Sequence, residues 1–139
     1  MACSLSTPEH VYAQTSGFKV IVHPDNPTTS LSAKDVSNYL LKKKTKWNAD
    51  GFKEKVDPID LGGDSPTRET FSKEVHGRSV SSIKSFWQRQ IFSGREVPPP
   101  EAASDAEVIT YVKSHPGAIG YVSASASLDG VKVVSVADG

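Results

Sequence analysis

A glycine turn that opens directly onto a capped helix constrains this 139-residue chain more than any other segment. Residues 62–71 have the sequence GGDSPTRETF. Ser65 suits the N-cap position, and Pro66 suits the first helical position, where a missing N–H costs nothing. The unpaired N–H groups of such a helix start, the hydroxyl of Thr67 and the guanidinium of Arg68 would point toward one place. The segment therefore predicts a strand end, a helix start and a candidate oxyanion site together.

Segments typical of strands and of helices alternate along the rest of the chain. Largely apolar runs predict strands at residues 18–22, 56–61, 118–122 and 131–136. Helices are expected after the N-cap residues Ser32, Ser65 and Ser104, and near residues 82–92. Because Pro58 cannot donate to a neighbouring strand, we expect its strand at a sheet edge. The order β-α-β-α-α-α-β-β predicts an α/β fold with a mixed sheet of about four to five strands flanked by helices.

Composition limits the class of protein. With 37% hydrophobic and 23% charged residues, the chain is typical of one soluble globular domain, which we expect at residues 17–139 after a flexible N-terminal segment at residues 1–16. Sixteen basic and sixteen acidic residues cancel, which argues against a nucleic-acid partner. No stretch approaches the roughly 20 apolar residues of a membrane span, and the N-terminus lacks the apolar core of a signal peptide.

The sequence shows no arrangement of residues that indicates catalysis. The four histidines, His10, His23, His76 and His115, show no metal-ligand spacing. Cys3 lies near the N-terminus without a positioned base, so it is not expected to act as a nucleophile. We therefore predict no catalytic residue, no metal site and no cofactor.

Several motifs occur in an order that resembles one lobe of the periplasmic phosphate-binding proteins of bacterial ABC transporters. The resemblance extends from Phe18 to Val136. Its motifs are the strand at 18–22, Leu31-Ser32 before a helix, Trp47, Ser65-Pro66-Thr67 in place of a Ser-Gly-Thr turn, Phe71 four residues beyond that threonine, and the closing segment GAIGY at 117–121. The resemblance implies a single periplasmic-binding-protein-like lobe.

The same resemblance implies a solute-binding module that binds phosphate or a similar oxyanion weakly, in the periplasm or at the cell envelope. It implies Ser65, Thr67 and Arg68 as the phosphate-binding residues. The hydroxyls of residues 28–30 also follow a strand, and if their loop emerges at the same sheet edge as Ser65, both loops lie where α/β folds usually bind ligands.

Three departures from the family pattern bear on that site. Pro66 replaces the middle glycine of the Ser-Gly-Thr turn, which removes one N–H donor. The family's arginine shortly before the motif is absent, because Leu61 and two glycines stand there, and Arg68 is the candidate to replace it. The second lobe of the family cleft is also missing from this sequence, and a homodimer would be one way to supply it.

A different class of function is an interaction or scaffold domain that keeps the lobe fold but binds a protein partner. That hypothesis predicts an exposed apolar patch that includes Trp47, Trp87, Phe92 or Tyr121. For Trp87 and Tyr121, packing in the core is the favoured interpretation.

Overall fold

The computed structural model describes residues 17–47, 49 and 51–137, so the expected segment 1–16 lies outside the described residues. The helical elements are α1 (Ala33–Leu40), α2 (Pro66–Phe71), a π-helical turn η3 (Ser72–His76), α3 (Val80–Phe92) and α4 (Asp105–Ser114). The strands are β1 (Phe18–Val22), β2 (Ser30–Ser32), β3 (Asp57–Pro58), β4 (Asp60–Leu61), β5 (Glu101–Ala102), β6 (Ala118–Ser123) and β7 (Lys132–Ala137).

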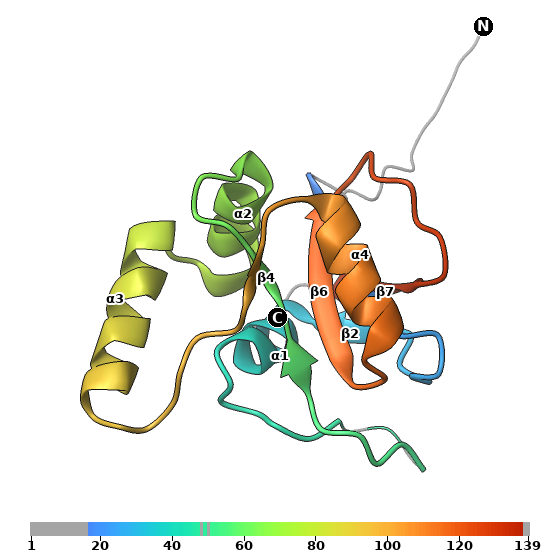
Figure 1. The fold of residues 1–139 in the computed structure, drawn as a ribbon, viewed down its shortest axis with the longest axis horizontal. Coiled ribbons are helices and arrows are strands. Elements are labelled where there is room, and N and C mark those ends of the chain that lie inside the picture. The colour runs from blue at the N-terminus through green and yellow to red at the C-terminus, as the bar shows by residue number, and fades with distance from the viewer. Residues whose placement is uncertain (1–16, 48, 50, 138–139) are drawn as a thin grey trace, which may run out of the picture.

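Five strands form one mixed sheet in the order β2-β7-β1-β6-β3. β1 is antiparallel to both of its neighbours, whereas β2 runs parallel to β7 and β3 runs parallel to β6. β4 and β5 form a separate parallel ladder. Figure 1 shows α4 lying along β6, with α3 on the far side of β4. The predicted α/β class and the mixed sheet of four to five strands are confirmed.

The central strand β1 is buried as its apolar sequence predicts. Val20, Ile21 and Val22 are each at most 1% exposed, which is typical of a strand covered on both faces. Its neighbour β6 carries Gly120, where an added Cβ would lie 2.8 Å from side-chain atoms of both Val108 and Ile59. The missing side chain therefore lets α4 pack closely against the sheet.

Serine N-caps begin all four of the α-helices that the structure describes. In each case the hydroxyl accepts a hydrogen bond from the N–H three residues on, and the caps are Ser32, Ser65, Ser79 and Ser104. Three of these caps are predicted from the sequence. The helix expected near residues 82–92 begins earlier, at Val80, and Gly94 follows its end with a φ of 72°. A left-handed glycine is a common helix stop.

Pro58 divides the segment that the sequence predicts as one strand. Its first part, β3, pairs with β6 at the edge of the five-stranded sheet, as expected for a strand with proline. Its second part, β4, leaves this sheet and pairs with β5. β2 and β5 are only three and two residues long, and neither is predicted from the sequence.

Aromatic packing joins α2 to the sheet. The rings of Phe71 and Tyr121 stack with centroids 3.7 Å apart, and Phe18 packs edge-on against Phe71. Trp47, Trp87 and Tyr121 are 6%, 5% and 0% exposed, so all three belong to the core. The expectation that Trp87 and Tyr121 are buried is confirmed.

Replacing Gly117 with alanine should destabilise the fold strongly. An added Cβ would lie 1.9 Å from the carbonyl oxygen of Lys55, so one backbone segment must move. We expect Gly117→Ala to lower the free energy of unfolding by about 2 kcal/mol or more, measured by urea denaturation. Gly62→Ala is the control, because the nearest atom to its added Cβ is 3.8 Å away. Equal losses in the two variants would contradict this account.

Candidate functional site

The turn between β4 and α2 forms one wall of a hollow of about 600 Å³. Its lining residues are Gly62, Gly63, Asp64, Ser65, Lys84, Glu101 and Ala103. The N–H of Ser65 donates to the carbonyl oxygen of Gly62, and its hydroxyl accepts from the N–H of Arg68 at 3.2 Å. The predicted strand end, turn and helix start are therefore present at this place.

Backbone donors remain available in this turn. Within the part of the chain that the structure describes, the N–H groups of Gly63, Asp64 and Thr67 donate no hydrogen bond. Pro66, as a proline, has no backbone N–H to donate. Because Asp64 lines the same hollow, its carboxylate opposes a bound anion there.

Lys84 is a member of this site that the sequence analysis missed. It comes from α3, and its Nζ lies 2.7 Å from the position that a Cβ on Gly63 would occupy. Among the described residues, Lys84 forms no ion pair or hydrogen bond. Its amine is therefore an unpaired cation lying over the glycine turn. Its place beside Gly63 depends on where α3 lies relative to the turn after β4, so no local sequence pattern signals it.

Arg68 points into the protein, and its guanidinium is held by the chain. It is 4% exposed, and its Nη1 donates to the carbonyl oxygen of Leu61 at 2.9 Å and to Oε2 of Glu101 at 2.7 Å. Its Nη2 lies 3.7 Å from Oδ2 of Asp60. Arg68 thereby lines a second, smaller hollow of about 190 Å³, which shares Lys84 and Glu101 with the first.

The partner of Arg68 belongs to a buried network. Asp60 is 5% exposed, and its Oδ1 accepts a hydrogen bond from the hydroxyl of Tyr121, which itself accepts from the N–H of Leu61. Burial raises the pKa of the Asp60 carboxyl, and the nearby Arg68 charge opposes that rise. Burial also raises the pKa of Tyr121, and the Asp60 charge adds to the effect. The network ties β4, α2 and β6 together.

The three predicted binding residues thus lie in different environments. Ser65 lines the larger hollow, Arg68 lines the smaller one, and Thr67 lines neither. Their role in binding phosphate stays a prediction.

The loop with residues 28–30 does not lie at this site. β1 is antiparallel to β6, whereas β3, which leads into β4, is parallel to β6. The loop after β1 therefore leaves from the opposite end of the sheet. The carbonyl oxygen of Asn26 in that loop accepts a hydrogen bond from Nζ of Lys132. Lys132 lies opposite Val22, the last residue of β1, in the β1–β7 strand pair. The condition of one shared edge is not met.

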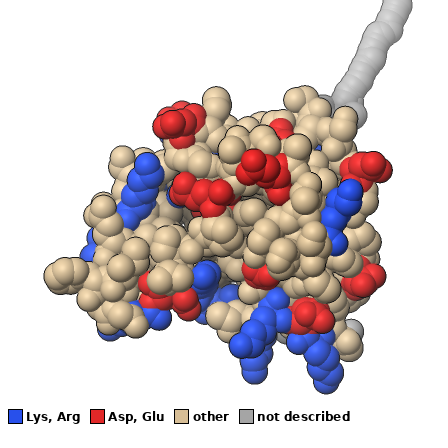
Figure 2. All heavy atoms as spheres, viewed as in Figure 1, with Lys and Arg blue, Asp and Glu red and all other residues tan. Residues whose placement is uncertain are grey.

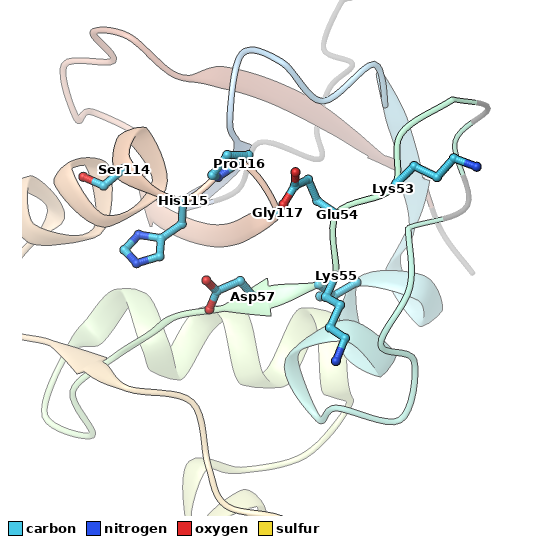
Figure 3. A pocket seen from close by; sticks show the side chains of 9 residues that line it. Lys53, Glu54, Lys55, Asp57, Ser114, His115, Pro116 and Gly117 are labelled. Carbon is cyan, nitrogen blue, oxygen red and sulfur yellow. The ribbon is translucent and has the colours of Figure 1, made fainter.

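Another hollow, of about 580 Å³, lies near the start of β6 (Figure 3). Tyr111 stacks on His115 and donates to Oδ1 of Asp57 at 2.5 Å. Figure 3 shows Lys53 and Lys55 extending away from His115, so their cations do not converge. No group of three or more acidic, histidine or cysteine residues suitable for a metal occurs among residues 17–47, 49 and 51–137.

The described part of the chain has no helix that is long and apolar enough to span a bilayer. Acidic and basic side chains are interspersed on the face shown in Figure 2. This face therefore presents no single-sign surface of the kind that nucleic-acid binding needs.

The chain is a mixed α/β lobe with an open hollow beside a helix start. A family model described as a PBP superfamily domain matches residues 8–138, and the chain belongs to this family. No curated protein matches the sequence.

Solved structures of phosphate transport proteins share the fold. A Clostridium perfringens protein, assigned as a phosphate ABC transporter substrate-binding protein and containing bound phosphate, is 23% identical with a TM-score of 0.69, over 86% of this chain and 44% of that one. An ABC-type phosphate transport receptor from Vibrio cholerae is 19% identical with a TM-score of 0.68, over 86% of this chain and 46% of that one. PstS from Borrelia burgdorferi is 15% identical with a TM-score of 0.63, over 86% of this chain and 47% of that one. The chain spans less than half the length of these proteins, which matches the expected single lobe.

Removing the Arg68 charge should destabilise the protein. Arg68→Leu leaves the buried Asp60 carboxylate without its cation, and we expect a loss of about 3–5 kcal/mol in urea denaturation. Arg89→Leu, on the exposed side of α3, is the control and should change stability by less than about 0.5 kcal/mol. Adding Asp60→Asn to Arg68→Leu should restore part of the loss. A mild effect of Arg68→Leu alone would contradict the buried-pair account.

His76 should make stability depend on pH. Burial, with repulsion from Arg68, Arg78 and Lys43, lowers its pKa to about 4, below the usual value of 6.5. Below pH 6.5 the unfolded chain binds the extra proton and the folded chain does not, so stability is lost as the pH falls from 6.5 toward 4. The loss should reach roughly 2–3 kcal/mol in urea denaturation across that range.

His76→Gln should flatten this part of the stability profile. An unchanged slope in His76→Gln would exclude this histidine as the cause.

Proposed function

We propose that this chain is a small-oxyanion binding module that holds phosphate or a similar anion weakly in the hollow formed by residues 62–65. The observation that carries the proposal is the unpaired amine of Lys84 lying over Gly63. The Ser65 hydroxyl lines the same hollow, and the N–H groups of Gly63 and Asp64 are free to donate. A tetrahedral oxyanion needs such donors on one side and a cation on the other.

Two features of the site favour weak binding. The carboxylates of Asp64 and Glu101 line the hollow and repel an anion. The hollow is also open, so water competes for the same donors and screens the charge of Lys84. The phosphate transport proteins of similar fold are longer, since the match covers only 44% and 46% of two of them, and a second lobe or a second copy of the chain would add donors from the open side.

The remaining parts of this proposal follow from the family. We propose that residues 17–139 act as one domain, that the chain acts in the periplasm or at the cell envelope, and that it binds solute without chemical conversion. Thr67 and Arg68 complete the proposed binding residues. Arg68 stands behind Glu101 and reaches the larger hollow only through the wall that the two hollows share.

A protein-binding role is the second candidate, because an apolar tip is exposed at the end of α3. Phe92 is 96% exposed, and Ile91 and Val97 are 53% and 56% exposed. Trp47, Trp87 and Tyr121 are buried, so this surface is smaller than the alternative hypothesis predicts.

Isothermal titration with phosphate, sulfate and chloride tests the anion-binding proposal. We expect saturable binding of phosphate at millimolar concentration, and a loss of at least about fivefold in affinity for Lys84→Met. Arg89→Met is the matched control, since it removes a cation from the same helix outside the hollow. The mass in solution shows whether a dimer is present. Absence of saturable heat with millimolar phosphate would refute the proposal.

A further inference from the structure

Glu101 occupies an unusual position between the two hollows. It lines the larger hollow with Lys84 and residues 62–65, and it lines the smaller one with Arg68 and Asp60. Its Oε2 accepts a hydrogen bond from Nη1 of Arg68 at 2.7 Å, yet its side chain is 49% exposed. Of the two residues that line both hollows, Lys84 and Glu101, only Glu101 contacts Arg68.

The charge of Arg68 does not require Glu101 as a partner. Asp60, with 7% of its side chain exposed, already lies against Arg68 and compensates the buried guanidinium. Glu101 is half in water, so its pairing with Arg68 is screened and its release costs little. When Glu101 turns away, Nη1 of Arg68 loses only this acceptor and keeps its hydrogen bond to the carbonyl oxygen of Leu61.

An oxyanion in the larger hollow would compete directly with this carboxylate. Both are negatively charged oxygen ligands, and Glu101 lines the larger hollow with Lys84 as well as the smaller hollow with Arg68. They cannot occupy this space together, since two anions at such close range repel each other.

We propose that Glu101 is a built-in competitor for the anion: its carboxylate occupies the place of the oxyanion on Arg68, and phosphate binds by displacing it. This inference rests on the proposed function. It assigns to Glu101 the role of setting the affinity of the site, and it gives Arg68 contact with the anion only after Glu101 has moved. Lys84 then faces the same anion from α3.

Titration of phosphate into wild-type protein, Glu101→Gln and Glu101→Ala tests the competition. Both variants should bind phosphate roughly five- to tenfold more tightly, because an adjacent like charge and a competing acceptor are removed. Asp64→Asn is the matched control. It removes a carboxylate from the same hollow, but Asp64 does not contact Arg68. Thermal unfolding of each variant shows that the fold is intact.

The outcomes separate this inference from the proposed function. Binding by the wild type with a clear gain in both Glu101 variants, and a much smaller gain in Asp64→Asn, supports both. Binding only by the Glu101 variants supports the competition and refutes anion binding by the unaltered chain. Equal binding by wild type and variants overturns the competition and leaves the proposed function standing. An equal gain in Asp64→Asn also overturns it, because general repulsion would then explain the effect. No binding by any form refutes both.

A direct readout comes from the Glu101 carboxyl carbon in NMR. Adding phosphate to wild-type protein should shift this signal as the carboxylate leaves Arg68. A signal that stays constant while phosphate saturates the site would overturn the displacement step.

Discussion

The buried pair of Asp60 and Arg68 is the interaction on which the candidate site depends. It joins β4 to the start of α2, and the Tyr121 hydroxyl extends it to β6, which pairs with the central strand β1. Charges buried in this way contribute less net stability than their proximity suggests, because desolvation offsets much of the attraction. Their effect is chiefly geometric, since each partner is costly to leave alone. The turn of residues 62–65 is thereby held in one position relative to the sheet.

The two cations near the turn, Arg68 and Lys84, have different roles. Arg68 compensates a carboxylate inside the protein, whereas Lys84 has no such partner among the described residues and lies over Gly63. A rigid, always-charged guanidinium suits the first task, and a flexible amine at the surface suits the second. The lobe therefore shares the fold of phosphate transport proteins, with one cation near its turn paired inside the protein and another unpaired at the surface.

Local features of the chain were predictable and tertiary ones were not. Ser32, Ser65 and Ser104 begin helices as predicted, because a cap is decided within about four residues. Lys84 and Glu101 reach the site from α3 and β5, through packing that no local pattern encodes. The sequence left open whether residues 28–30 approach Ser65 for a related reason, since the direction of β1 relative to β6 is a property of the whole sheet. Three- and two-residue strands such as β2 and β5 are too short to leave a periodic signal.

The two outer strands of the sheet affect how the lobe can associate. β2 and β3 span three and two residues, and β3 contains Pro58, which has no N–H to offer. Short edges and proline are known to block the addition of a further strand from another molecule. A second copy of the chain therefore finds only a short backbone edge at either margin of the five-stranded sheet. Side-chain surfaces of the described helices and loops are larger candidates for self-association, and they can be altered without disturbing the sheet.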